Sequence, residues 1–404
     1  MRLPIVLVAS LLIVACGTLP TPTARQAVAP QALALEGETD LAPASTRAPM
    51  VRQALQREGT KANDALVFKT VQTGAIKTVR KDGVELAGAL SFPDFDGKPV
   101  AAHHATVHVQ TQGMFGMAKE VGRAETDATG HWAVALDKDL VGKQVDVVYE
   151  LGNERWTIGN YRWAGPKLTL AAGATDTGAQ ALDPASQNGQ AGLIHLIWNR
   201  ALGEFERDHI DLGWWRAKIK TNWPASGNFY NFGAVNLTDA PWWDVNGHEI
   251  GHAMFFAAFD SASGAGEHYI DKCYAGSLAW SEGFGSFFSG VISLPRDDQD
   301  AKFEFMVPRR KPIRLENVPT DVCEGYTNEW RVCAAMWDVY DTHSDGSDHV
   351  AVDFKTIWDA LAKHDGTKMN DVRDAFARVA GTQPAAGRPD LAAAFGQAGV
   401  SVTR

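Results

Sequence analysis

The sequence predicts an α+β protein in which a small β-sandwich precedes a larger, mostly helical domain. Three observations lead to this prediction. Residues 61–165 hold short stretches of alternating apolar residues between Gly and Asp turns, which is typical of antiparallel strands. Beyond residue 191 apolar residues recur at helical spacing, so strands give way to helices along the chain. One helical stretch, HEIGHAMFF at positions 248–256, also carries two histidines one turn apart.

Length and charge limit the class of protein. The chain has 404 residues, enough for two or three domains, and its hydrophobic content of 45% and charged content of 21% are ordinary for a globular protein. The formal net charge is −10, and no strongly basic stretch stands out. We therefore expect no nucleic-acid partner.

The first 16 residues are typical of an export signal. One positive charge, Arg2, precedes an apolar run at residues 5–14 that is too short to span a bilayer. The run ends in IVAC at positions 13–16, which resembles a bacterial lipobox and implies a lipid on Cys16. An ordinary signal peptide with a chance cysteine is the alternative. The lipobox resemblance predicts an extracytoplasmic protein anchored to the membrane of the bacterial cell envelope.

Residues 17–60 are expected to form a flexible tether. Their first part is rich in Pro, Ala and Thr and has neither helical nor strand periodicity. A self-cleaving propeptide in this segment is the alternative, and its removal would release the protein from the anchor.

The predicted β-sandwich, residues 61–165, contains the stretches GVELAGALSF, ATVHVQT, HWAVALD and QVDVVYEL. In these, Trp132, Val134 and Leu136 alternate with smaller residues, and Val145, Val147 and Tyr149 share one face. The pattern resembles the transthyretin-like or carboxypeptidase-regulatory-like modules of exported bacterial proteins. Its histidines are expected to be exposed strand and loop residues that form no metal cluster: His103, His104, His108 and His131.

Residues 166–190, rich in Gly, Ala and Thr, are expected to be a linker, and residues 191–404 a second domain. That domain begins with AGLIHLIWNRALGEFE, whose apolar residues Leu193, Leu196, Ile197 and Leu202 have helical spacing. Strands are expected in WWRAKIKTNWP and FGAVNLTD, and the chain beyond residue 248 is expected to be mostly helical.

His248, Glu249 and His252 form the motif HExxH. On a helix, residues at i and i+4 lie on one face about 6 Å apart, so both imidazoles can bind one Zn²⁺. The glutamate between them can take a proton from water at the open position of the metal. Apolar residues follow at once, so the helix is expected to be buried, where unpartnered polar side chains are costly.

A third ligand is expected in LAWSEGFGSFFSGVI, where Glu282 lies in a second apolar helix. A catalytic zinc usually has three protein ligands and a water. The metzincin pattern needs a third histidine soon after His252, and the stretch AMFFAAFDSA has none. An aspzincin-like site, with Asp260 or Asp271 in place of Glu282, is the alternative.

The two motifs together, HExxH and WSEGFGSF, resemble the gluzincin metallopeptidases, the thermolysin-like and fungalysin-like group. The stretch NEWRVCAAMWDVYD at positions 328–341 resembles a helix of the fungalysin-like families. The resemblance implies a zincin-like fold and a zinc peptidase that cleaves peptides or proteins, with ligands His248, His252 and Glu282 and with Glu249 as general base. A surface binding or adhesion protein that retained the fold but lost activity is the alternative.

One position departs from the family pattern. The residue four after the ligand glutamate is often an aspartate that orients a zinc-bound histidine, and here it is Ser286. A metal-bound histidine needs an acceptor on its other nitrogen. Ser286 is a weaker acceptor than a carboxylate, and Glu329 or Asp338 is the expected substitute if it does not serve.

The family also implies a His or Tyr that stabilises the oxyanion of the transition state. Tyr326 is the first candidate, His343 and His349 are alternatives, and Tyr274 and His268 are weaker ones. In gluzincin-like folds the strand before the metal helix is a sheet edge that pairs with substrate. By that resemblance residues 233–237 would form the substrate wall, and an ordinary packed strand is the alternative.

Two further features concern cysteines and acidic residues. Cys273, Cys323 and Cys333 predict one disulfide and one free thiol in an oxidising compartment, with the pairing left open. The stretch DTHSDGSDH at positions 341–349 lacks the ligand order and the closing Glu of an EF-hand, so a solvated loop is expected there.

Overall fold

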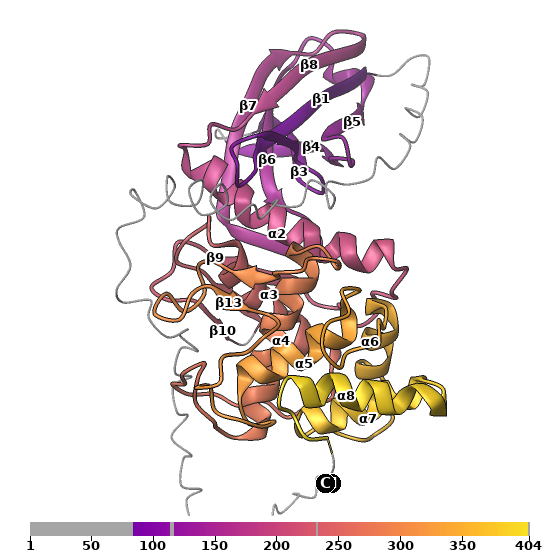
Figure 1. Ribbon diagram of the computed structural model, residues 1–404. Helices are drawn as coiled ribbons and strands as arrows, with labels where there is room; N and C mark the ends of the chain where they lie inside the picture. The colour runs from indigo at the N-terminus through magenta and orange to yellow at the C-terminus, as the bar shows by residue number, and fades with distance from the viewer. Residues whose placement is uncertain (1–83, 114–116, 232, 403–404) are drawn as a thin grey trace, which may run out of the picture.

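The computed structural model describes residues 84–113, 117–231 and 233–402. The predicted signal segment, Cys16, the tether and residues 61–83 of the predicted sandwich lie outside the described residues. The described chain is a mixed α+β protein, as predicted, with a strand-rich module at one end and helices at the other (Figure 1). None of its described helices is long and apolar enough to cross a membrane.

Most strands lie in two sheets, and the second sheet continues from the strand-rich module into the helical part (Figure 1). The first has the order β2-β1-β5, with β8 pairing on β1, and its strands are β1 (Val84–Pro93), β2 (Pro99–Ala101), β5 (His131–Leu136) and β8 (Gly173–Ala181). The second has the order β10-β11-β9-β7-β6-β3-β4. Its strands are β3 (Thr106–Gln112), β4 (Ala118–Glu125), β6 (Gln144–Gly152), β7 (Trp156–Thr169), β9 (Ile219–Asn222), β10 (Phe229–Asn231) and β11 (Ala234–Asn236).

The alternation of apolar residues sets which face of each strand is buried. Along β5 every second residue is buried, and along β6 the buried residues include Val145, Val147 and Tyr149, as predicted. Trp132 of the first sheet meets Tyr149 of the second edge-on, with ring centroids 6.2 Å apart. The inner faces of the two sheets therefore share one core.

The predicted linker at 166–190 is wrong. This segment holds the end of β7, all of β8 and the first turn of helix α2 (Gln187–Arg207). Strand β8 has the sequence GATDTGAQA, which lacks large apolar residues and gave no strand pattern. Its parallel pairing with β1, from Val84↔Gly173 to Ser91↔Ala181, is supplied by backbone hydrogen bonds to a strand far away in the sequence.

Strand β7 joins the two parts of the molecule. One stretch of it pairs with β6, and its first residues pair in parallel with β9, from Trp156↔Ile219 to Ile158↔Thr221. Helix α2 packs against β1, β6 and β7 on one side, and on the other against the helix that carries the HExxH motif and the helix that carries Glu282. In Figure 1 α2 runs between the strand-rich module and the helices.

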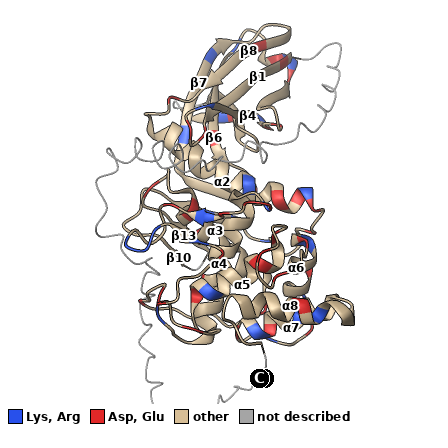
Figure 2. Ribbon diagram, viewed as in Figure 1, with Lys and Arg blue, Asp and Glu red and all other residues tan. Residues whose placement is uncertain are grey.

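The remaining elements build the helical part. Helices α3 (Trp243–Ala258) and α4 (Gly276–Ser293) form its centre, and α5 (Glu329–Tyr340) packs on α4. Nearly every residue of α3, α4 and α5 is buried, as their apolar composition predicts. The other elements are β12 (Lys302–Phe303), β13 (Ile313–Arg314), α6 (Phe354–Leu361), α7 (Val372–Thr382) and α8 (Arg388–Gln397). Lys and Arg are interspersed with Asp and Glu along both parts of the chain (Figure 2).

Two local predictions need correction. Strand β11, within the predicted substrate wall at 233–237, is not a sheet edge, because it pairs with β9 on one side and β10 on the other. The edge at this end of the sheet is β10. His108 is not exposed, because it lies 3% exposed between the carboxylates of Glu120 and Glu150, at 2.6 and 3.1 Å from its two ring nitrogens.

Candidate metal centre

Close helix packing brings the two motifs together. A Cβ on Gly251 of α3 would lie 2.9 Å from the backbone of Gly285 of α4, and one on Gly247 would lie 2.5 Å from the Ser289 hydroxyl. Gly247 and Gly251 are four residues apart, so they form one strip on α3. This strip lets the backbones of α3 and α4 approach, which sets the distance between the side chains they carry.

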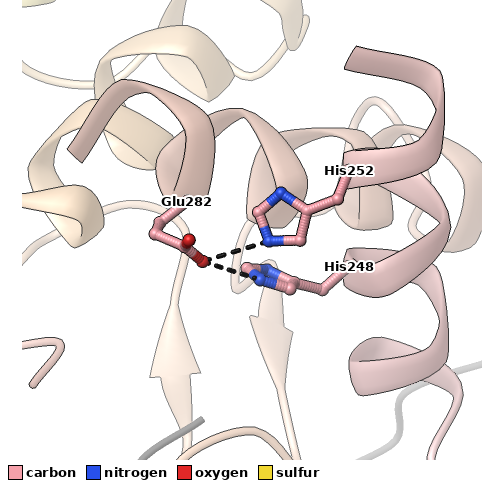
Figure 3. A group of neighbouring side chains, drawn as sticks. All are labelled: His248, His252 and Glu282. Carbon is pink, nitrogen blue, oxygen red and sulfur yellow. Dashed lines mark hydrogen bonds and ion pairs between the residues drawn. The ribbon is translucent and has the colours of Figure 1, made fainter. Parts of the chain in front are cut away.

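Three of the predicted ligands converge across this contact. His248 and His252 project from consecutive turns of α3, and Glu282 faces them from α4 (Figure 3). One carboxylate oxygen, Oε2 of Glu282, lies 3.2 Å from Nε2 of His248 and 3.1 Å from Nε2 of His252. The three side chains are at most 1% exposed, and their ligand atoms lie within 4.8 Å of one another.

These distances fit a tetrahedral metal ion. Zinc binds imidazole nitrogen and carboxylate oxygen at about 2.0–2.2 Å, which places neighbouring ligand atoms of a tetrahedron about 3.4 Å apart. Burial lowers the pKa of His248 to about 4, with the nearby Glu282 opposing it, so the imidazole is neutral and able to bind metal. Burial opposes ionisation of Glu282, but the charge of His252 and the hydrogen bonds of both histidines hold the pKa of Glu282 well below its usual range.

Ser286, at the position where the sequence resemblance leads us to expect an aspartate, contacts the predicted ligand His248. Its hydroxyl oxygen lies 3.0 Å from Nδ1 of His248 and 3.7 Å from Sδ of Met306. A hydroxyl that donates to the Met306 sulfur can accept the Nδ1–H of His248. In that tautomer, which is the one able to bind a metal through Nε2, neutral His248 would direct the lone pair of Nε2 toward Oε2 of Glu282. A cation between the two acceptors relieves this contact.

Met306 is held in place by the start of α3. Oδ2 of Asp244 accepts backbone N–H groups from Glu304, Phe305 and Met306 at 2.7, 2.7 and 3.2 Å. Ser289 adds a bond of 2.8 Å from its hydroxyl to the carbonyl of Asp244. A buried carboxylate thus fixes the segment that carries Met306 relative to α3 and α4.

The other expected substitutes for the missing aspartate lie elsewhere. Glu329 contacts His268, and Asp338 lies in an acidic group at the far end of α5. Within the described part of the chain, Nδ1 of His252 has no hydrogen-bond partner. Glu249, the predicted general base, is fully buried on α3 directly after His248.

A fourth side chain, His268, reaches the group from the loop between α3 and α4. Its Nε2 lies 3.7 Å from Oε2 of Glu282 and 3.3 Å from Oε2 of Glu329, while Nδ1 faces the carbonyl of Gly266 at 3.1 Å. An imidazole with acceptors at both nitrogens is placed to donate from both. His268, Glu282 and Glu329 form a second group of potential ligands that shares Glu282 with the first.

The loop that carries His268 is fixed from several sides. A disulfide joins Cys273 to Cys323, which settles the open pairing, and Cys333 is a buried free thiol. The side-chain amide of Asn328 donates 2.8 Å bonds to the carbonyls of Ile270 and Lys272. These contacts tie the loop to the start of α5, where Glu329 lies.

The remaining predicted residues lie outside this group. The Tyr326 ring packs beneath Arg373, whose guanidinium carbon is 3.7 Å from the ring centroid. No hydrogen bond or ion pair among the described residues joins Tyr326 to His248, His252 or Glu282. Asp271, the alternative ligand, pairs with Arg309 at 2.8 Å. His343 lies near Glu316, and His349 contacts Ser344.

The sequence makes His268 only a weak candidate and gives no signal for Met306. Both lie in loops without periodicity, so spacing alone could not place them. One feature could have raised His268: it lies between the two ligand helices and five residues before Cys273, whose disulfide restrains that loop.

Comparisons with known proteins identify no relative from which a family or a function can be assigned. No protein-family model matches the chain, and no curated protein matches it. Among solved structures, it is similar to a 9R-lipoxygenase from Cyanothece PCC8801, at 13% identity and a TM-score of 0.17. That match covers 41% of this chain and 30% of the lipoxygenase, and so low a TM-score does not establish a common fold.

Proposed function

We propose that this protein is a zinc-dependent metallopeptidase of the gluzincin type. In this proposal a zincin-like domain follows, along the chain, a transthyretin-like or carboxypeptidase-regulatory-like module. One observation carries the proposal. Nε2 of His248 and Nε2 of His252, one turn apart on α3, lie at tetrahedral-edge distances from a single oxygen of Glu282 on α4. Zinc, when bound, supplies a Lewis acid that polarises the scissile carbonyl and lowers the pKa of water.

The residues divide the remaining work. His248, His252 and Glu282 hold the ion, and Ser286 orients His248 through its Nδ1–H. Glu249 takes a proton from the attacking water and delivers it to the leaving amine. His268, held by Glu329 beside Glu282, replaces Tyr326 as our candidate donor to the developing oxyanion. The substrate is a peptide or protein.

A second function is favoured by one specific observation. His248, Glu249, His252 and Glu282 are at most 1% exposed, and His268 is 4% exposed, so a peptide cannot reach them in this conformation. A surface binding or adhesion protein that keeps a buried metal to stabilise its fold would need no such access. The two functions share the metal and differ in turnover.

Metal analysis and a peptide-library assay on the purified chain separate these functions. For the peptidase we expect one zinc per chain, hydrolysis of some library peptides, and loss of hydrolysis with zinc retained in Glu249→Gln. Glu267→Gln is the matched control, because Glu267 is an exposed glutamate in the loop between α3 and α4. Stoichiometric zinc without cleavage of any peptide supports the binding protein. Metal-free protein with His248 intact contradicts both.

We further propose that the chain is exported and anchored through a lipid on Cys16. The proposal rests on the apolar run and the IVAC sequence at positions 13–16. Mass spectrometry of the native N-terminus tests it. An acylated Cys16 at the start of the mature chain is the expected result, and an N-terminus beyond residue 16 without lipid contradicts the anchor.

A further inference from the structure

A separate buried group of potential metal ligands, here called the acidic site, lies at the end of α5, away from His248 and His252. Asp341 is the residue after the helix, and Glu316 reaches it from the chain that follows β13. The two side chains are 1% and 4% exposed. All four of their carboxylate oxygens are buried without a hydrogen-bond partner of normal geometry among the described residues. Burying two such groups together is costly unless a cation or a proton lies between them.

The surrounding charges add to this cost. Asp338 and Asp348 are also buried, and Asp345 is close enough to repel them. Asp338 and Asp341 lie at the C-terminal end of α5, where the helix dipole disfavours negative charge. No Lys or Arg of the described chain pairs with Glu316 or Asp341. One imidazole nitrogen, Nδ1 of His343, lies 3.9 Å from Oε2 of Glu316.

The ionisation of the pair agrees with this picture. Burial raises the pKa of Asp341 to about 8, and the adjacent Glu316 adds to the shift. Burial likewise raises the pKa of Glu316, and the nearby Asp341, His343 and Trp337 offset this only in part. A bound cation would let both carboxylates ionise at neutral pH.

Hydrogen bonds fix the loop after Asp341 and leave the carboxylates of Glu316 and Asp341 facing one another. Oδ1 of Asp348 accepts the backbone N–H of Asp345 at 2.6 Å, and Gln397 of α8 bonds to both Asp345 and Ser347. Asp345 and Asp348 therefore hold the loop's shape. The ligand atoms that lie within 4.8 Å of one another come from Glu316, Asp341 and His343.

We propose that Glu316 and Asp341, with His343 beside them, bind a divalent cation that fastens the end of α5 to the chain after β13. Two carboxylates are hard oxygen ligands, so Ca²⁺ is the first candidate. A contribution from the His343 imidazole would instead favour Mn²⁺ or Zn²⁺. The acidic site shares no residue with the group formed by His248, His252 and Glu282. This proposal can therefore be tested independently of the proposed peptidase function.

Thermal unfolding of the full chain tests the acidic site, with Ca²⁺ as the probe. Bound metal is first removed from the protein with a chelator, followed by dialysis. We expect about 1 mM Ca²⁺ to raise the unfolding midpoint of the wild type, with one Ca²⁺ bound per chain. In Asp341→Asn we expect at least a tenfold loss of Ca²⁺ affinity. The metal-free midpoint of this variant should equal or exceed that of the metal-free wild type, because the amide replaces a buried carboxyl whose ionisation is costly there. This second readout shows that the variant folds.

Asp359→Asn is the matched control, because Asp359 is an acidic residue on α6 with a side chain 53% exposed. It should keep the Ca²⁺ response. Parallel titrations with Mn²⁺ and Zn²⁺, in the wild type and His343→Ala, identify the ion: stabilisation that requires both Asp341 and His343 supports a pocket with a nitrogen ligand. Unchanged midpoints for all three ions, or equal shifts in wild type and Asp341→Asn, overturn the proposal and leave a carboxyl pair that shares a proton.

Discussion

The backbone of Gly251 on α3 touches the backbone of Gly285 on α4, and this contact sets the geometry of the histidine pair. A Cβ at Gly251 would lie 2.9 Å from both Cα and the carbonyl oxygen of Gly285. A Cβ at Gly285 would meet the imidazole of His248 at 3.1 Å. Both glycines are therefore required for close approach and not for an unusual backbone angle.

Gly251→Ala should push α3 and α4 apart. We expect the free energy of unfolding to fall by about 1–3 kcal/mol, the usual range for overpacking a tight core, and zinc affinity to fall with it. Gly381→Ala is the control, because a Cβ on this residue of α7 meets nothing within 4 Å. That substitution should be neutral or slightly stabilising. Denaturant unfolding and metal titration of both variants provide the measurement, and wild-type zinc affinity in Gly251→Ala would show that the helix spacing is not needed.

Ser286→Ala removes the hydroxyl that lies 3.0 Å from Nδ1 of His248. We expect zinc affinity to fall roughly 10–100-fold while the fold is kept, because the ligand loses the partner that fixes its tautomer. Ser281→Ala is the matched control, since the Ser281 hydroxyl is also buried on α4 but bonds to the carbonyl of Leu278. Competition with a chromophoric chelator measures both affinities. An equal change in the two variants would assign the effect to lost helix packing.

His268→Gln and Tyr326→Phe compare two candidates for the oxyanion donor. Because His268 lies beside Glu282 and Tyr326 packs beneath Arg373, we expect kcat to fall roughly 100–1,000-fold in the first variant and to stay near wild type in the second. Steady-state kinetics on a cleaved library peptide, with zinc content measured in parallel, provides the test. A large loss of kcat in Tyr326→Phe with normal zinc content would restore the prediction made from the sequence.

The pH dependence of stability should reveal His104. Burial lowers the pKa of His104, but the carboxylates of Glu125 and Glu206 outweigh burial and raise it from 6.5 to about 9. Because the folded-state pKa is raised, the stabilisation is complete below pH 6.5 and is lost as the pH rises through about 9. We expect the wild type to lose about 1–2 kcal/mol across this window relative to a Glu125→Gln, Glu206→Gln double variant, since both carboxylates are nearly half exposed.

Denaturant unfolding at pH 6 and pH 9.5 measures that difference. Glu154→Gln, a change at an exposed glutamate in the turn between β6 and β7, should follow the wild type. Parallel pH curves for the wild type and the double variant would show that His104 does not carry the effect.

The strands and helices with strong apolar patterns could be predicted, because their burial follows from local spacing. Strand β5 and helix α4 are two such cases. The approach of His248, His252 and Glu282 was predicted for a related reason, since two are one helical turn apart and the third is a lone carboxylate in an apolar helix. Their metal and their chemistry stay predictions.

The missed features depend on contacts between distant segments. Strand β8 has no apolar pattern and exists through pairing with β1, and the edge position expected for β11 is taken by the three-residue strand β10. His268 meets Glu329, 61 residues later, through a disulfide-restrained loop. The proposed role of Ser286 as an acceptor for His248 depends on the contact between its hydroxyl and Met306. Met306 is in turn held by a hydrogen bond from its backbone N–H to Asp244. Local spacing carries no information on such pairs.

The parallel pairing of β7 with β9 means that the strand-rich module cannot simply be cut away. A chain that began at residue 191 would lack β7, leaving three residues of β9, from Ile219 to Thr221, with unsatisfied backbone donors and acceptors on a newly bared strand. It would also lack the first turn of α2, whose cap is Ser186. Any force applied to the N-terminal strands would likewise pass through this ladder into the sheet that adjoins α3, so the two halves should unfold together when the molecule is pulled.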